Sequence, residues 1–403
     1  QKNCITKVCD EILTGKLEGN FPLAVWQTGS GTQSNMNVNE VIANRGNELA
    51  GKKLLHPNDH VNMSQSSNDT FPTAMHIAAV LQIHNKLIPA MDEMIRTFER
   101  LESENQDVIK SGRTHLQDAT PIRFSQEISG WRGMLEKTRE MLYASLPPLE
   151  EIALGGTAVG TGLNAPKGFG EEAAKAVSEF TGIPFKTAGN KFHALTSKDA
   201  IVFAHGALKA LAADMMKIAN DVRWLSSGPR CGLGEIRIPE NEPGSSIMPG
   251  KVNPVIPEVV NQVAFNVIGN DMSVTMAAEA GQLELNAFEP IIFYKLFQSI
   301  ETISSAVRTL VDNCILGITA NEERCRNMVE GSVGIITAIC PYVGYEKAAN
   351  IAKEAIKTGK SVRELILRDK LLTGEQLDII LDPISMTEPG ISGIKKMEQL
   401  GGM

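Results

Sequence analysis

The sequence predicts an all-α protein built on a bundle of long helices, with smaller N- and C-terminal domains. Aromatic residues make up only 5% of the chain, whereas Ala, Met and Leu recur throughout, and those residues lose little side-chain freedom in a helix. Apolar residues also recur at alternating spacings of three and four, which is typical of helices that pack nearly parallel. Segments rich in Gly, Ser, Thr, Asn and Pro separate these runs, where loops are expected.

Four stretches predict the long helices. The longest run of alternating spacings covers residues 201–225, and it would span roughly 35 Å at 1.5 Å per residue. Residues 81–98 and 292–314 have the same rhythm, and residues 259–280 have a less regular one. Because residues 200–216 are apolar or neutral on most faces of their helix, one chain could hardly bury them all. We therefore expect a large core between subunits.

The length of the chain allows two or three domains. It has 403 residues, which is too many for a single compact core. We expect an N-terminal domain over residues 1–66, the central bundle over 67–320 and a small helical domain over 321–403. The last region has shorter apolar runs and more charge than the bundle, and it ends in prolines and paired glycines.

The charge balance limits the partners of the protein. The formal net charge is -8 and the pI is near 5.5, so neither nucleic acid nor an anionic membrane is expected as a partner. No segment is apolar for long enough to span a bilayer, and the N-terminus has no signal-peptide pattern. The six cysteines lack the close spacing of a metal site. We expect them to be buried, reduced thiols, which favours a cytoplasmic location.

Two polar segments in the first quarter of the chain are candidate anion sites. Residues 29–39 include Ser30 and Thr32, neutral donors of the kind that bind a carboxylate, although a polar turn capping a helix that starts near Val38 is the simpler interpretation. Residues 56–73 have the same composition and precede a long helix, whose first amides carry partial positive charge. Here a helix cap and an anion site are equally compatible with the sequence. The polar residues before that helix are Ser66, Ser67 and Asn68.

A third segment, GRTHLQDATP at residues 112–121, carries a histidine in a predicted loop. His115 follows Thr114 and lies near Arg113, and a histidine in such a place can transfer protons at neutral pH. A lone histidine in a loop is more often a surface or capping residue, so this segment predicts little by itself.

The fourth segment, GSSIMPGKVNP at residues 244–254, is the most informative. Its glycines make the loop mobile and its prolines fix the turns, while Ser245, Lys251 and Asn253 supply reactive side chains. A structural loop has little use for that combination. Glu258 follows one turn later, where it could reach a neighbouring histidine.

This loop resembles the signature loop of the fumarase/aspartase superfamily, and the other three segments match that family in order and spacing over essentially the whole chain. The resemblance implies a long-helix bundle of the L-aspartase type. It also implies a homotetramer whose active sites are each built from three subunits, and it implies no metal or other cofactor. The expected reaction removes a proton from the carbon next to a carboxylate and passes through a dianionic aci-carboxylate.

The resemblance also implies roles for individual residues. Ser245 is expected to be the general base, and His115, paired with Glu258, is expected to position or activate the water that is lost or added. Lys251 and Asn253 are expected to hold the dianion. The other positions that match the family's substrate contacts are Ser30, Thr32, Ser66, Ser67, Asn68 and Thr114. Residues similar to a secondary anion site of the family are His56, Pro57, Asn58 and Asp59.

The branch of the family follows from the residues expected to touch the substrate. Ser67 stands where aspartases typically have Thr, which favours the class II fumarases and the reversible anti-elimination of water from (S)-malate to give fumarate. Residues 255–261, 277–286 and 386–393 look more like aspartase, so deamination of L-aspartate to fumarate and ammonia is the alternative.

A catalytically silent assembly like the lens crystallins of this superfamily is a further alternative, although the presence of Ser245, Lys251, Asn253 and His115 argues against it. Family members commonly carry several tens of residues before the point that matches Gln1. We therefore expect the N-terminal domain to be truncated relative to the family.

Overall fold

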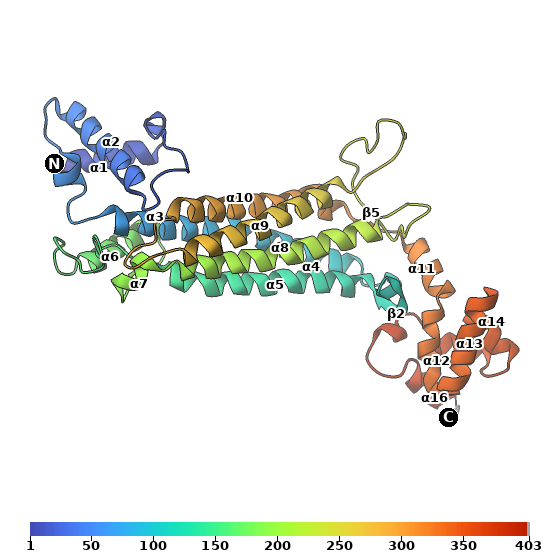
Figure 1. The fold of residues 1–403 in the computed structure, drawn as a ribbon. Coiled ribbons are helices and arrows are strands. Elements are labelled where there is room, and N and C mark those ends of the chain that lie inside the picture. Colours follow the sequence, from blue (N-terminus) through green and yellow to red (C-terminus); the bar gives the residue numbers. More distant parts are fainter. Residues whose placement is uncertain (401–403) are drawn as a thin grey trace. The chain divides into compact units, whose positions relative to one another are not determined.

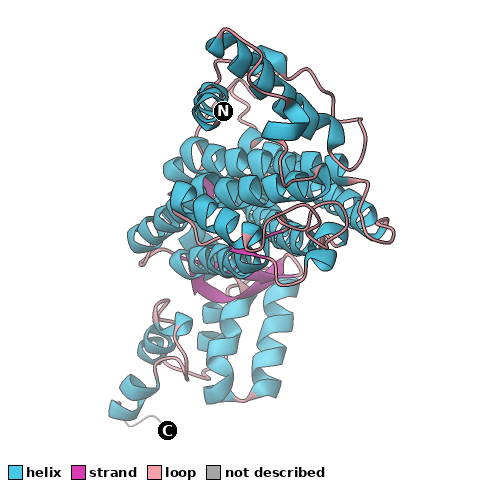
Figure 2. Cartoon of the chain, turned by 90° about the vertical axis from the view of Figure 1, so that its left-hand side faces the viewer, coloured by secondary structure: helices cyan, strands magenta, loops and turns pink. Residues whose placement is uncertain are grey.

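The computed structural model describes residues 1–400, and its elements are helices with a few short strands (Figures 1 and 2). The all-α prediction is confirmed. The helices are α1 (Lys2–Leu13), α2 (Thr32–Ala50), α3 (Ser67–Gln82), α4 (Ile88–Glu104), α5 (Phe124–Leu149), α6 (Phe169–Thr181), α7 (Lys191–Thr196), α8 (Asp199–Leu225), α9 (Val255–Glu279), α10 (Glu289–Asn313), α11 (Glu322–Gly331), α12 (Ile336–Val343), α13 (Tyr345–Thr358), α14 (Val362–Arg368), α15 (Gly374–Ile380) and α16 (Ile394–Gln399). The strands are β1 (Ile109–Thr114), β2 (Gln117–Arg123), β3 (Glu151–Ile152), β4 (Lys186–Thr187), β5 (Ile236–Arg237) and β6 (Thr319–Ala320).

The chain divides into two compact units. The first unit comprises Gln1–Asp92, Lys137–Met215 and Val260–Val307, and the second comprises Glu93–Glu136, Met216–Val259 and Arg308–Met403. Helices α4, α5, α8, α9 and α10 each contribute residues to both units. The division into three domains at residues 66 and 320 stays a prediction.

Long helices form the core of the first unit. Its segments of α5, α8, α9 and α10 lie side by side (Figures 1 and 2). The residues predicted to face the seam of α8, such as Ile201, Leu208 and Met215, are fully buried. Helices α8 and α10 have nearly the predicted bounds, whereas α9 begins four residues before the predicted start, at Val255. Glu258 therefore lies in the first turn of α9.

The helix predicted over residues 81–98 is interrupted. Between α3 and α4 the chain makes one π-helical turn, Ile83–Leu87, which shifts the phase of the residues that face inward. Ile83 and Leu87 are fully buried in consequence, while the neighbouring His84 is only half-buried. The apolar rhythm resumes in α4, where Met91 is buried as predicted.

In the second unit, a predicted loop forms a regular element. Residues 111–121 belong to the antiparallel hairpin β1–β2, with register pairs that run from Ile109 opposite Arg123 to Thr114 opposite Gln117. The loop prediction was wrong because the turn between these strands lacks glycine, the usual sequence signal of a tight hairpin.

The small helices α11–α16 also belong to this unit, and their apolar side chains form a cluster around Ile339, Leu365 and Leu377.

Two predictions from composition concern cysteines and membranes. All six thiols are free, and Cys314 and Cys325 are buried, but Cys231 is exposed, so the expectation of burial was wrong for that residue. Among residues 1–400, no helix combines the length and apolar character that a membrane span requires.

Candidate functional site

Three hydroxyl groups gather where α2 and α3 begin, in the first unit. The Thr32 hydroxyl lies 2.9 Å from that of Ser67 and 3.1 Å from that of Ser30. The preceding turn requires glycine, because a Cβ on Gly29 would lie 1.3 Å from the carbonyl oxygen of Ala287. Two helix N-termini and three small hydroxyls form a suitable environment for a carboxylate.

Helix α2 begins at Thr32, six residues before the predicted start near Val38. The asparagines of its first turns bind other protein groups. The side-chain amides of Asn35 and Asn39 both donate to Oδ1 of Asn62, at 3.0 and 2.9 Å. That of Asn37 donates to the carbonyl of Asn20 at 3.0 Å. These bonds fix α2 to its surroundings and so hold Thr32 in place.

Asp69 is a residue of this region that the sequence interpretation missed. It is fully buried, and its carboxylate accepts hydrogen bonds from the amides of Ser66 at 2.9 Å, Gly155 at 3.0 Å and Thr157 at 2.8 Å. Burial raises the pKa of Asp69, and these hydrogen bonds oppose that rise because they favour the charged form. Asp69 thus ties the loop around residue 155 to the start of α3. The spacing Ser-x-x-Asp before an apolar run is a recognisable signal for this capping box.

Ser66 is the N-cap of α3, so the helix-cap interpretation of this segment is confirmed. Its hydroxyl oxygen accepts a hydrogen bond from the amide of Asn68 at 3.2 Å. The side-chain amide of Asn68 donates to the carbonyl of Ala158 at 2.8 Å. Contacts of Ser66 and Asn68 with a substrate stay predictions.

The predicted secondary anion site is a single π-helical turn, Pro57–Val61. Nδ1 of His56 accepts a hydrogen bond from the amide of Asp59 at 3.2 Å and lies 3.4 Å from its carboxylate. Nδ1 of His60 accepts from the amide of His56 at 2.9 Å. The turn is therefore ordered by its own side chains. Its binding of an anion through His56, Pro57, Asn58 and Asp59 stays a prediction.

In the second unit, His115 lies at the tip of the β1–β2 hairpin. His115 and Leu116 form its two-residue turn with φ values of 55° and 60°, the left-handed conformation that type I′ turns require and that Asn and Gly normally supply. For other residues this conformation costs about 1–3 kcal/mol each, so the rest of the hairpin must stabilise it. His115 and Thr114 are exposed at this tip.

The loop that carries Ser245 closes on itself. The amide of Gly244 donates to the carbonyl of Lys251 at 2.9 Å, and the side-chain amide of Asn253 donates to the carbonyl of Gly244 at 2.7 Å. A Cβ on Gly244 would lie 2.2 Å from the carbonyl oxygen of Lys251. Only glycine permits this close approach, which explains its place in the motif.

Within the loop, the Ser245 hydroxyl is surrounded by backbone amides. Its oxygen accepts hydrogen bonds from the amides of Ile247 at 3.3 Å and Met248 at 3.0 Å. Two such donors aimed at one oxygen stabilise negative charge on it. The arrangement suits a serine that must lose its own proton before it can accept another.

Lys251 and Glu258 line one cavity of about 730 Å³ in the second unit. Its wall also contains Arg223 and Arg237, and Nη2 of Arg223 lies 3.7 Å from Oε1 of Glu258. Three cations line this cavity against two carboxylates, of Glu240 and Glu258, so a dicarboxylate would meet favourable charge here. The pairing of Glu258 with His115 stays a prediction. Among residues 1–400, no group of three or more His, Cys, Asp or Glu side chains has the arrangement of a metal site.

The chain is similar to lyases of known activity. A family model described as lyase matches residues 1–269, and one described as the fumarase C C-terminus matches residues 335–388, which include part of the region that looked like aspartase. The class II fumarate hydratase of Campylobacter jejuni is 54% identical over 394 residues, which are 96% of this chain and 85% of that protein. The class II fumarate hydratase of Bacillus subtilis is 53% identical over 389 residues, which are 96% and 84%.

Solved structures agree with these relatives. The class II fumarase of Schistosoma mansoni matches with a TM-score of 0.94 at 40% identity, and the match covers 96% of this chain and 85% of that one. The fumarate lyase:delta crystallin of Brucella melitensis matches with a TM-score of 0.92 at 48% identity and the same coverage.

Proposed function

The chain belongs to the lyase family of the class II fumarate hydratases, and from this we infer that it is a fumarate hydratase that interconverts (S)-malate and fumarate. The observation that carries the inference is identity of 54% to a class II fumarate hydratase over 96% of the chain. The geometry of the Ser245 loop and of the cavity lined by Lys251 supports it, because both suit the removal of a proton next to a carboxylate.

Ser245 is the general base in this proposal. Its alkoxide would take a proton from C3 of malate, and the electron pair left behind would pass into the neighbouring carboxylate. A serine hydroxyl is a poor base at neutral pH, so the alkoxide needs stabilisation. The amides of Ile247 and Met248, at 3.3 and 3.0 Å from the Ser245 oxygen, supply it.

Lys251 and Asn253 would hold the dianionic carboxylate. Carbon acids of this kind are weak, and only strong binding of the second negative charge makes deprotonation feasible. Lys251 lies in the wall of a mainly cationic cavity. The side-chain amide of Asn253 donates to the carbonyl of Gly244, and it would exchange that bond for one to the substrate.

The hydroxyl group on C2 leaves as the carbon–carbon double bond forms. In this proposal His115 supplies the proton that turns it into water, directly or through a bound water molecule, and Glu258 orients the imidazole. Thr114 precedes His115 at the exposed tip of the hairpin and would contact the substrate. The hydroxyl cluster of Ser30, Thr32 and Ser67 would bind the other carboxylate.

The first prediction concerns the substrate. Because Ser67 stands where the aspartases have Thr, L-malate should be dehydrated with a far higher kcat/KM than L-aspartate is deaminated. Both reactions form fumarate, so its absorbance measures the two substrates in parallel on one enzyme preparation. A higher kcat/KM for L-aspartate would contradict the assignment, and no turnover of either substrate would favour a silent crystallin-like protein.

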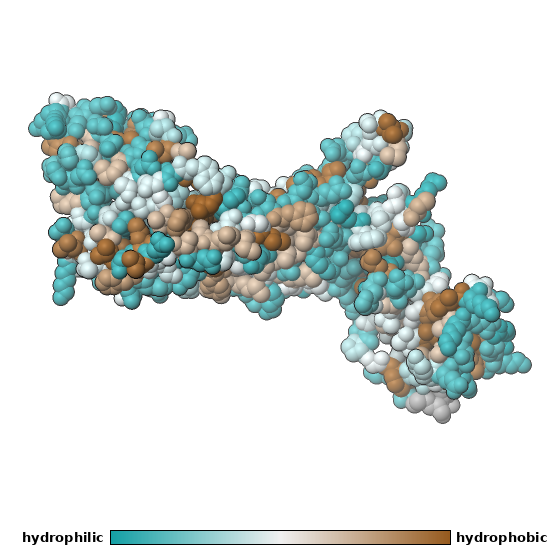
Figure 3. Space-filling model, in the orientation of Figure 1, coloured by the Kyte–Doolittle hydropathy of each residue, from teal (hydrophilic) through white to brown (hydrophobic). Residues whose placement is uncertain are grey.

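We also propose that the protein is a homotetramer with active sites shared between subunits. On α9 the residues Phe265, Met272 and Met276 are 61%, 63% and 58% exposed. With Ile268 they follow spacings of three, seven and eleven residues, which place them on one face of the helix. Figure 3 shows hydrophobic residues, in brown, on the surface of the long helices. A continuous apolar face of this kind is typical of a helix that packs against another subunit.

The second prediction tests that assembly. If Ser245 and His115 of one active site come from different subunits, mixing the impaired variants Ser245→Ala and His115→Asn should raise activity above that of either variant after subunit exchange. Some mixed tetramers would then contain sites with both intact residues. Each variant treated alone in the same way is the control. A monomer by light scattering that retains full activity would rule out shared sites.

The cellular role follows from the reaction. A fumarate hydratase links fumarate to malate, and we propose that this protein performs that step of the tricarboxylic acid cycle in the cytoplasm. The free thiols are compatible with a reducing compartment.

A further inference from the structure

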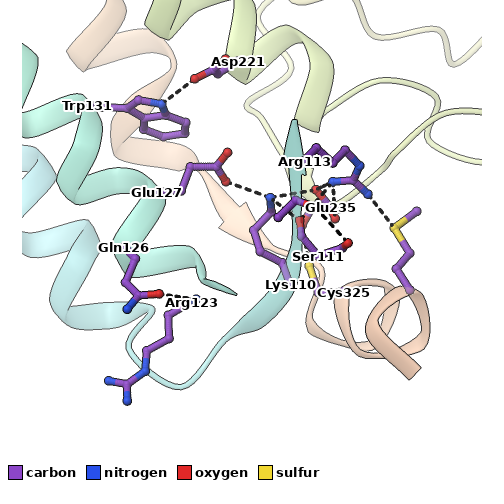
Figure 4. Close-up of polar contacts among 12 residues, drawn as sticks. Lys110, Ser111, Arg113, Arg123, Gln126, Glu127, Trp131, Asp221, Glu235 and Cys325 are labelled. Atoms are coloured by element: carbon purple, nitrogen blue, oxygen red, sulfur yellow. Dashed lines mark hydrogen bonds and ion pairs between the residues drawn. The ribbon is translucent and has the colours of Figure 1, made fainter. Parts of the chain in front are cut away.

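Four charged side chains gather at the base of the hairpin that carries His115, two of them buried (Lys110 and Glu235) and two partly buried (Arg113 and Glu127). Figure 4 shows Lys110 and Arg113 of β1 pointing toward Glu235, and Lys110 also reaching Glu127 of α5. Nη1 of Arg113 lies 3.0 and 2.9 Å from the two carboxylate oxygens of Glu235. Nζ of Lys110 lies 3.0 Å from Glu127 and 3.4 Å from Glu235. Two cations therefore neutralise two carboxylates.

The burial of this cluster is unusual for charged groups. The Glu235 side chain is 0% exposed and that of Lys110 is 2% exposed, and burial raises the pKa of Glu127 while Lys110 opposes the rise. Apolar side chains of similar volume would often stabilise a fold as well as a buried ion pair does. A gain in folding stability therefore does not explain the cluster, whereas a need to hold the hairpin in one orientation does.

Glu235 is itself held firmly by its main chain. Its amide donates to the carbonyl of Leu225, the last residue of α8, at 2.9 Å, and its carbonyl accepts from the amide of Asn321 at 2.8 Å. The Cys325 thiol of α11 also donates to that carbonyl, at 3.6 Å. The Glu235 carboxylate is thus a fixed point against which a strand can be aligned.

Strand β1, which carries Arg113, needs support where it leads into the turn at His115. Arg113 is one residue from Thr114 and two from His115, where the turn adopts left-handed φ values without glycine. The register of the hairpin also shifts between Ser111 and Arg113, so the ladder alone does not fix the direction of the tip. A further bond from Arg113, from Nη2 to the sulfur of Met328 at 3.5 Å, adds to its support.

We propose that Glu235 is a positioning residue, which acts through Arg113 to aim Thr114 and His115 at the reacting water, with Lys110 and Glu127 balancing its charge. The proposal rests on the proposed function for its kinetic consequence. Its structural part, that Glu235 orders the hairpin tip, stands independently. A displacement of about 1 Å in a reacting group can cost about 10²-fold in rate, so a small shift of the tip is enough to matter.

The test is the variant Glu235→Gln, which keeps the shape of the side chain and removes its charge. We expect kcat for fumarate formation to fall about 10- to 100-fold with a smaller change in KM, because the proposed substrate contacts other than Thr114 lie outside the hairpin. The same substitution made in a His115→Asn background should have almost no further effect on kcat. Residues that act through one another are non-additive in such a double-mutant cycle, whereas a general loss of stability is additive.

Glu102→Gln is the matched control. Glu102 makes a bidentate pair with Arg132 in the same unit, at 2.6 and 3.3 Å, and neither residue touches the hairpin in any bond described above. Its loss should lower thermal stability without changing kcat. Arg113→Lys is a second positioning variant, which keeps the charge but not the two-oxygen contact. It should show a weaker form of the effect expected for Glu235→Gln, and it provides the test if Glu235→Gln does not fold.

Amide hydrogen exchange of the peptide that spans residues 111–118 gives a readout that does not depend on malate turnover. Faster exchange there in Glu235→Gln or Arg113→Lys, but not in Glu102→Gln, supports the proposal. Unchanged exchange of this peptide, or full additivity with His115→Asn, overturns it. If the wild-type enzyme turned over no malate, the proposed function would fail, and the exchange data would still decide whether Glu235 orders the tip.

Discussion

Replacement of Ser245 by Ala is expected to lower kcat for malate dehydration by about 10²- to 10⁴-fold, the usual contribution of a general base. The substitution removes one oxygen and leaves the closure of the loop between Gly244 and Lys251 intact. KM should therefore stay within a few-fold of the wild-type value. Steady-state kinetics in the fumarate-forming direction measures both quantities.

The adjacent Ser246 supplies the comparison for this prediction. Ser246 is exposed in the same loop. The hydroxyl oxygen of Ser245 accepts hydrogen bonds from two backbone amides, which distinguishes it from its neighbour. Ser246→Ala should therefore lose less activity than Ser245→Ala. The reverse order would mean that the base has been assigned to the wrong serine.

Replacement of Lys251 by Ala should have a different signature, with a rise in KM as well as a fall in kcat. The ammonium group would contact a carboxylate that is charged in the ground state and carries more charge in the transition state. Truncating one member of a buried charge pair typically costs about 2–5 kcal/mol, so kcat/KM should fall by about 30- to 5000-fold.

Lys251→Arg is the control for the charge of Lys251. It keeps the positive charge in the wall of the cavity but changes its shape, so it should recover part of the lost substrate binding and less of the rate. Titration with fumarate or a non-reacting dicarboxylate separates the two effects. An unchanged KM in Lys251→Ala would show that this residue does not bind the substrate carboxylate.

The long helices could be predicted from the sequence because burial imposes a pattern on it. In α8, inward residues such as Leu208 and Met215 are apolar and the spacing is unbroken. Helix α2 was placed six residues late because its first turns are polar. Its stability there comes from side-chain bonds such as that between Asn35 and Asn62, which have no periodic signature. The π turn at Ile83–Leu87 likewise has no local signal.

The sequence indicated the residues proposed for the site more readily than the buried acidic residues that hold the surrounding segments in place. Ser245 and Lys251 stand in a motif whose glycine is required by a 2.2 Å approach, so their grouping follows from the sequence. Asp69 was recoverable from its spacing to the N-cap Ser66. Glu235 was not, since an acidic residue in a polar stretch is normally solvated. Only the fold brings it to Arg113, 122 positions away in the chain.

Exchange of the carbon-bound hydrogens of malate with heavy water, followed by NMR, tests the central claim most directly, because it isolates proton removal from water loss. The wild-type enzyme should exchange one of the two hydrogens on C3. His115→Asn should retain exchange that is faster than its formation of fumarate, since it is impaired mainly in handling water. Ser245→Ala should show no exchange beyond its residual turnover. Near-normal exchange in Ser245→Ala would contradict the account and make His115 with Glu258 the candidate base.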